Sequence, residues 1–205
     1  YKATDVLSFA HPALVVVGAG VISALAVDRG VPFWLAFIIG IVATGLIGLI
    51  VERTFLRPMV GEPVFSVAIL TIGIDLLLRT ILNNWIGLNP RYLGDPFPSF
   101  GNFGSLVFSG VTLKYLELAA LFTAIIMISL LTVFFKKSKY GVAMMATAYD
   151  QEAALAQGIN VGRIFGLVWL IAGILAGFAG FFITGGFNTL TPVSYTHLRA
   201  HETDR

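Results

Sequence analysis

Asp75 and Arg79 are two oppositely charged residues within an otherwise apolar segment of the chain. They stand four residues apart, so on a helix they lie one turn apart on the same face. Ionisable groups inside a membrane are costly and mark functional positions by default. Two interpretations follow. The simpler is a mutually neutralising pair that faces the interior of a helix bundle; the other is a pair that lines a transport pathway.

A second candidate is the polar stretch from Lys136 to Asn160, which separates two apolar segments. It opens with three lysines in four residues and continues through good helix formers. We expect a short helix held outside the membrane, where it could receive a mechanical signal from a partner. Its Glu-Ala-Ala-x3-Gly pattern consists of Glu152, Ala153, Ala154 and Gly158.

Histidines with metal-ligand spacing occur only near the carboxyl end of the chain. His197 and His201 stand four residues apart, with Glu202 and Asp204 just beyond. The composition changes abruptly in this region, and residues 193–205 resemble a translated sequencing-adaptor read-through. We therefore expect a non-native tail there, and no metal site.

The composition is that of a membrane protein. Only 12% of the residues are charged, whereas soluble domains carry about 25%. The absence of cysteine excludes disulfides and thiolate metal sites. A net charge of +2 is too small to indicate nucleic acid as a partner. His11, the histidine outside the tail, is expected at the membrane edge as an interfacial residue.

Five segments are long and apolar enough to cross a bilayer, which takes roughly 20 residues. Each must be helical, because isolated strands cannot satisfy their backbone groups in lipid. We therefore predict an all-α fold, a polytopic transmembrane helical bundle with five spans. The predicted spans are Pro12–Val27, Pro32–Val51, Val64–Leu82, Tyr115–Phe135 and Ile164–Phe187.

Small residues recur every fourth position in two of these spans, as in Gly173-x3-Gly177 and Gly40-x3-Thr44-x3-Gly48. Such stripes let helices approach closely and predict a packed bundle. The connection 83–114 is rich in proline, glycine and asparagine, which predicts an ordered external loop without long helices. That loop is either a connector or a docking surface for an external substrate-delivering protein.

Basic residues are distributed unequally between the two ends of the predicted spans. The positive-inside rule places the richer side, with the loops 52–63 and 136–163, in the cytoplasm. The richer side holds Lys2, Arg53, Arg57, Lys136, Lys137, Lys139 and Arg163, and the other side holds Arg29, Arg91 and Lys114.

Four motifs in this order resemble the H-type permease of the branched-chain amino acid ABC importers. Together they span most of residues 8–192. They are Phe9-Ala10-His11, Glu52-Arg53-x3-Arg57-Pro58, Thr71-Ile72-Gly73-Ile74, and Ser138-Lys139-Tyr140-Gly141 leading to Asp150 and Gly158-Ile159-Asn160. The chain departs from the family at Val142 and Met145, where relatives usually carry arginines.

The resemblance implies that Glu152 to Gly158 form a coupling helix, which docks in a groove on a cytoplasmic ATPase. It further implies ATPase subunits that bind the ATP, a second permease subunit, an external substrate-binding protein and surrounding membrane lipid. The location would be the cell membrane of a bacterium or archaeon. Residues 1–192 would form a permease domain that is incomplete at both ends, with further spans before and after it.

The leading functional hypothesis is therefore a permease subunit for branched-chain amino acids or similar small polar solutes. The chain has no Gly-x4-Gly-Lys-[Ser/Thr] phosphate loop, so ATP would be bound by partner subunits, and we expect no cofactor and no catalytic residue in this chain. The alternative is a secondary transporter driven by an ion gradient through groups such as Asp75. A membrane enzyme or assembly factor would need a polar cluster that the sequence does not supply.

Overall fold

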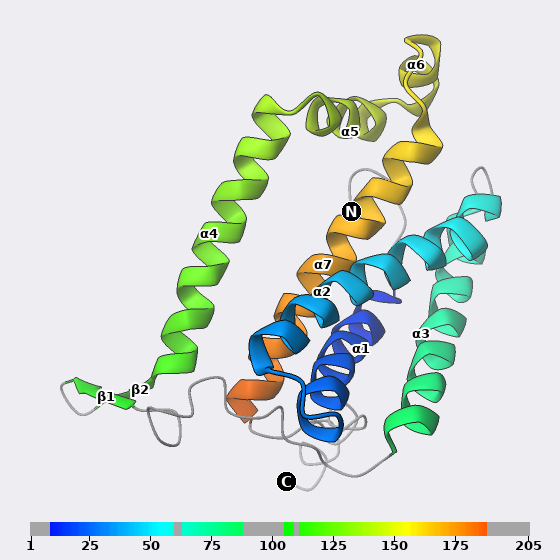
Figure 1. The fold of residues 1–205 in the computed structure, drawn as a ribbon. Coiled ribbons are helices and arrows are strands. Elements are labelled where there is room, and N and C mark those ends of the chain that lie inside the picture. Colours follow the sequence, from blue (N-terminus) through cyan, green and yellow to red (C-terminus); the bar gives the residue numbers. More distant parts are fainter. Residues whose placement is uncertain (1–8, 60–62, 88–104, 109–110, 188–205) are drawn as a thin grey trace, which may run out of the picture.

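A computed structural model describes residues 9–59, 63–87, 105–108 and 111–187, and most of these residues are helical (Figure 1). The α-helices are α1 (His11–Ser23), α2 (Phe33–Val51), α3 (Val64–Ile86), α4 (Tyr115–Lys137), α5 (Lys139–Tyr149), α6 (Gln151–Ala156) and α7 (Val161–Phe187). The shorter elements are the π-helical turns η1 (Ala24–Asp28) and η2 (Glu52–Leu56), the 3-10 turn η3 (Arg57–Met59), and the strands β1 (Ser105–Phe108) and β2 (Val111–Lys114).

Five helices of the described chain are long and apolar enough to cross a membrane. They are α1 continued by η1, α2 continued by its turns, α3, α4 and α7. The predicted all-α bundle with five spans is therefore confirmed. The short antiparallel hairpin of β1 and β2 lies in the connection that was predicted to lack long helices, and the rest of that connection, 88–104 and 109–110, lies outside the described residues.

The long helices alternate in direction, so their connections gather at two opposite ends (Figure 1). One end, called the α6 end below, is where α2 finishes, α3 and α7 begin, and α5 and α6 lie. Most of the basic residues assigned to the cytoplasmic side occur at this end. Those in the described chain are Arg53, Arg57, Lys136, Lys137, Lys139 and Arg163.

The centre of the bundle consists of α1, α2 and α7, with α3 packed on α1 (Figure 1). A buried cluster joins the four helices and contains Leu14, Val51, Ile74, Trp169 and Ala176. Because lipid offers no hydrophobic reward for helix association, close van der Waals packing must hold these helices together.

Glycines produce that packing, as the small-residue stripes predicted. A Cβ added at Gly173 would lie 2.7 Å from the carbonyl oxygen of Thr44 and 2.9 Å from the Cα of Gly45. One added at Gly18 would lie 2.7 Å from the Cα of Gly177. Side chains at these positions would collide with backbone, so glycine is what allows α7 to touch both α2 and α1.

Helix α1 begins inside the bundle. The backbone N–H of Phe9 donates to the hydroxyl of Thr71 at 3.2 Å, and the rings of His11 and Trp169 lie 5.1 Å apart. Trp169 is eight residues along α7 from Val161, a rise of about 12 Å. His11 is also the first residue of the first apolar span, so its expected place at the membrane edge stays a prediction.

Helix α4 stands apart from the centre (Figure 1). Leu116, near its start, is its one buried residue in the described chain and packs with Ile22 and Phe181. From there to its end, the side chains of α4 are half-buried on one face and exposed elsewhere, including Phe122 at 63% and Ile128 at 65%. The described residues therefore cover little of the surface of α4.

Candidate functional site

The polar stretch at the α6 end forms two helices, whereas the sequence predicted one. Asp150 has an extended backbone (φ −156°, ψ 110°), which ends α5. Its side chain then accepts a hydrogen bond from the N–H of Ala153 at 2.9 Å and caps the start of α6. The single-helix prediction was wrong at this residue because aspartate competes for backbone donors better than it continues a helix.

Gly158 ends α6 in a left-handed conformation (φ +80°). The N–H of Ile159 donates to the carbonyl of Ala154 at 3.0 Å, and the N–H of Gly158 donates to that of Leu155 at 2.9 Å. This is the Schellman arrangement that stops a helix at glycine. Two residues later, the side chain of Asn160 accepts from the N–H of Arg163 at 3.0 Å and starts α7. The Asp150, Gly158 and Asn160 motif thus specifies a short helix between two sharp turns.

A close approach also fixes the corner between α4 and α5. A Cβ at Gly141 would collide with the carbonyl oxygen of Phe134 and lie 2.7 Å from the Cα of Phe135. Glycine therefore lets α5 fold sharply across the end of α4, as Figure 1 shows. Helix α5 then leads the chain across the α6 end to α6, which is followed directly by α7 (Figure 1).

The four residues predicted to couple to a partner do not all face outward. Glu152, Ala153 and Gly158 are exposed, whereas Ala154 is buried within the chain at 3% exposure. Leu155, which sequence reasoning did not select, is 57% exposed. An apolar side chain left exposed on a short polar-flanked helix suits a protein groove, and only the three-dimensional structure shows which residues of α6 point outward.

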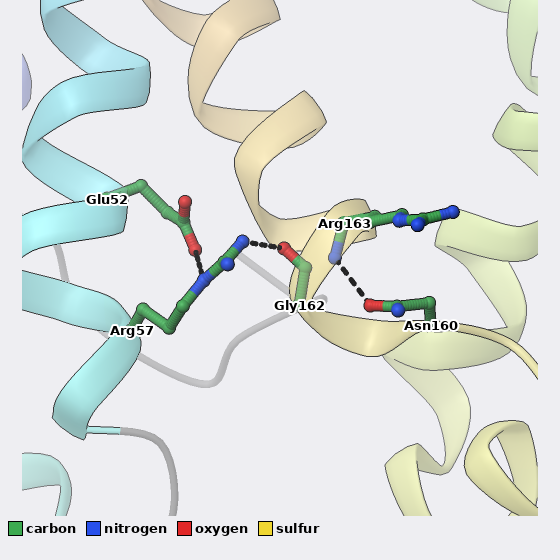
Figure 2. Close-up of polar contacts among 5 residues, drawn as sticks. All are labelled: Glu52, Arg57, Asn160, Gly162 and Arg163. Atoms are coloured by element: carbon green, nitrogen blue, oxygen red, sulfur yellow. Dashed lines mark hydrogen bonds and ion pairs between the residues drawn. The ribbon is translucent and has the colours of Figure 1, made fainter.

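A polar junction joins α2 to α7 beside this segment (Figure 2). The Nε of Arg57 lies 3.4 Å from Oε1 of Glu52, and its Nη2 donates to the carbonyl oxygen of Gly162 at 2.7 Å. Glu52 is 1% exposed and Arg57 is half-exposed. The sequence supplied these two residues as part of a family motif, but not this contact across more than a hundred residues.

Gly166 has no side chain and so leaves room for the carboxylate of Glu52 to pack against α7. A Cβ at Gly166 would lie 3.2 Å from Oε2 of Glu52 and 3.1 Å from Leu49. Oε2 is buried and has no hydrogen-bond partner among the described residues. Glu52 therefore depends on Arg57 for neutralisation, since an unpaired buried charge is strongly unfavourable.

Asp75 and Arg79 form an ion pair, with Oδ2 and Nε 2.8 Å apart. Both side chains are largely buried, at 19% and 22% exposure. Oδ1 of Asp75 is buried and lacks a hydrogen-bond partner among the described residues. The geometry is that of a neutralising pair on α3; a role in lining a pathway remains a prediction.

The described chain contains no group of three or more histidine, cysteine or acidic residues that could hold a metal ion. The spaced histidines of the tail 193–205 lie outside the described residues, as does most of the connection 83–114 for which a docking surface was suggested. The described polar side chains instead form the ion pairs Glu52–Arg57 and Asp75–Arg79. The α6 segment, residues 150–160, and the junction of Glu52, Arg57 and Gly162 beside it are the candidate functional site.

Comparison with known proteins identifies a family. A family model described as branched-chain amino acid transport system / permease component matches residues 1–198. The probable branched-chain amino acid transport permease LivH of Methanocaldococcus jannaschii is 28% identical over 182 residues, covering 88% of this chain and 57% of the relative. The high-affinity permeases BraD of Pseudomonas aeruginosa and LivH of Escherichia coli are 23% and 26% identical, over 94% of this chain and 65% of each relative.

The chain thus spans about three fifths of the length of the curated relatives it matches. No solved structure matches it significantly.

Proposed function

The chain belongs to the family of permease components of branched-chain amino acid transport systems, and from that premise we propose that it is a membrane subunit of an ATP-driven importer. It is a multi-pass membrane protein of a transport system. The ATPase subunits, the second permease subunit and the external substrate-binding protein belong to the proposal. So does the substrate class, branched-chain amino acids or similar small polar solutes, which the names of the relatives suggest for this chain.

The observation that carries the proposal is the placement of α6. It is a short helix outside the apolar spans, capped at both ends, with Ala153 and Leu155 exposed and the membrane helix α7 starting a few residues later. A groove on a partner could hold such a helix through its exposed apolar residues. Movement of the partner would then act directly on the start of α7.

ATP would drive transport by a shift of population. The permease alternates between outward-facing and inward-facing states, and the ATPase binds those states with different affinity depending on its nucleotide. The free energy available for the switch equals the difference between the binding free energies of the ATPase for the two states. The described chain contributes the docking helix and the rigid helix pair behind it, while ATP stays on the partner.

Substitution of Leu155 by arginine in the reconstituted transporter tests the proposal. The added charge would be buried in the partner's groove, so ATP-linked amino acid uptake should be lost while the permease remains in the membrane. Thr54→Arg is the matched control, because Thr54 is exposed in η2 at the same end of the bundle. Ala154 is unsuitable as a test position, since it is buried within its own chain.

Uptake equal to that of the control would contradict the coupling role of α6. Uptake that persists without the ATPase and collapses with the ion gradient would favour the secondary-transporter alternative instead. In that case Asp75, whose buried Oδ1 has no hydrogen-bond partner among the described residues, would be the first residue to examine.

A further inference from the structure

The junction of Glu52, Arg57 and Gly162 connects the end of α2 with the start of α7 (Figure 2). Gly162 is four residues beyond Gly158, which ends α6. The guanidinium of Arg57 therefore holds the backbone at the point where the α6 segment becomes a membrane helix. Its contact is with a main-chain carbonyl, so any displacement of that backbone acts on Arg57 directly.

Glu52 orients the guanidinium. Its buried Oε1 pairs with Nε on one edge of the group, and this leaves Nη2 directed at the carbonyl of Gly162. The planar fork of arginine suits such a bridge, because its donors are fixed relative to one another. A lysine has one terminal nitrogen and cannot occupy both positions with the same geometry.

Below the junction, α2 and α7 stay in backbone contact. A Cβ at Gly48 would lie 2.7 Å from the carbonyl oxygen of Trp169, and one at Gly173 would lie 2.7 Å from that of Thr44. The two helices are thus in contact from the α6 end into the membrane. Because α2 and α7 are joined at the α6 end and packed along their length, they can move as one body.

Two neighbouring arginines lie at the same end of the bundle but do not make the contact that Arg57 makes. Arg53 is exposed and its side chain has no hydrogen bond or ion pair with the described residues. Arg163 is also exposed, and its guanidinium points away from Glu52 (Figure 2). Both have the charge that topology requires, whereas only Arg57 bridges the two helices.

We propose that Arg57, oriented by Glu52, is a positioning residue that joins the α6 segment to α2, so that displacement of α6 moves α2 and α7 together. The proposal rests on the proposed function, because it assigns the route by which motion from an ATPase enters the bundle. Without the junction, motion of α6 would be absorbed at the start of α7 and ATP hydrolysis would no longer be matched by transport.

The first test measures amino acid transported per ATP hydrolysed by the complete transporter in proteoliposomes. R57Q lowers this ratio by about tenfold, within the range of coupling free energies between sites, while ATP hydrolysis continues. R57K, which keeps the charge but not the fork, also lowers it. R53Q leaves the ratio close to that of the unsubstituted complex. A ratio for R57Q or R57K equal to that of R53Q overturns the proposal.

The second test does not require a variant of Arg57 to fold. Because the chain has no cysteine, spin labels can be attached at Arg53→Cys and Arg163→Cys, one on each side of the junction. The distance between the labels stays the same with and without ATP if α2 and α7 move together. An ATP-dependent change in that distance overturns the proposal.

Failure of the proposed function gives a different result. An unsubstituted complex that takes up no amino acid with ATP overturns the proposed function. ATP-linked uptake with the same stoichiometry in R57Q and R53Q overturns only the role of Arg57.

Discussion

Helices α4 and α7 are joined through α5 and α6 at the α6 end (Figure 1), and although both are long and apolar, they differ in how closely they pack against the other helices. Helix α7 packs against α1 and α2 through glycines that touch backbone, as at Gly173 and Gly177. Helix α4 has no glycine and is buried within the described chain only at Leu116. The α6 segment therefore connects a tightly packed helix to one whose side chains are largely free of the chain's own core.

The difference shows how a displacement at the α6 end would travel. Packed interfaces change between discrete arrangements and do not deform continuously. Motion that reaches α7 is therefore passed to α2 and α1, because their backbones touch. A tilt of α4 would disturb few side chains of the described residues, chiefly those around Leu116.

The largest effect is expected from leucine at Gly173. The new side chain would collide with the backbone of Thr44 and Gly45, so α7 would separate from α2 at a cost of about 3 kcal/mol or more. The folded permease should largely disappear from the membrane. Gly73→Leu is the control, because a Cβ at Gly73 on α3 meets nothing within 4 Å. Equal accumulation of the two variants would contradict the packed seam.

Isoleucine-to-alanine changes compare the two helices directly. Ile164 on α7 is 5% exposed and Ile128 on α4 is 65% exposed. I164A should lower the free energy of unfolding by about 2–5 kcal/mol through a cavity, and I128A by less than about 0.5 kcal/mol. Denaturant titration of the purified permease in mixed micelles measures both. A large loss in I128A would mean that α4 is packed against something that the described residues do not include.

Gly158→Ala should weaken the connection between the two helices. Alanine in the left-handed conformation of Gly158 (φ +80°) costs about 1–2 kcal/mol, so α6 should fray and its amides should exchange hydrogen faster. Gly162→Ala is the matched control, because a Cβ there makes ordinary contacts at 3.6 Å. Equal exchange rates in the two variants would show that the Schellman turn is not what ends α6.

Asp75→Asn should have the smallest effect. Helix α3 lies between the two extremes, packed on α1 along one side only. Asparagine keeps an acceptor for Arg79, and Arg79, two turns from the end of α3, can extend its guanidinium toward the membrane surface. Both the free energy of unfolding and transport should therefore fall only modestly. Complete loss of uptake by a normally folded D75N protein would make Asp75 a pathway residue.

Much of the architecture could be read from the sequence because lipid imposes simple rules. Length and apolarity identified five spans, and the spacing of Gly173 and Gly177 identified a packing face. Hydropathy alone could not separate α4 from α7, since both are apolar throughout. The absence of glycine in α4 was the available signal, and it distinguishes a helix that packs closely from one that does not.

The candidate site was harder to predict than the fold. Asp150, Gly158 and Asn160 stood out as a family motif, and the structure gives each a local role in capping or ending a helix. The exposed Leu155 did not stand out, because the side of α6 that faces outward depends on how the segment is held at both ends. The contact of Arg57 with Gly162 spans the whole chain between α2 and α7, so no local pattern could reveal it.

Thiol labelling tests whether α6 is the surface on which an ATPase acts. A single cysteine at Leu155→Cys, in a chain that otherwise has none, reports whether α6 is covered, and Arg29→Cys at the opposite end of the bundle is the reference. Binding of the ATPase should slow labelling at position 155 several-fold and leave position 29 unchanged. Labelling at position 155 that proceeds at the same rate with the ATPase bound would contradict the account.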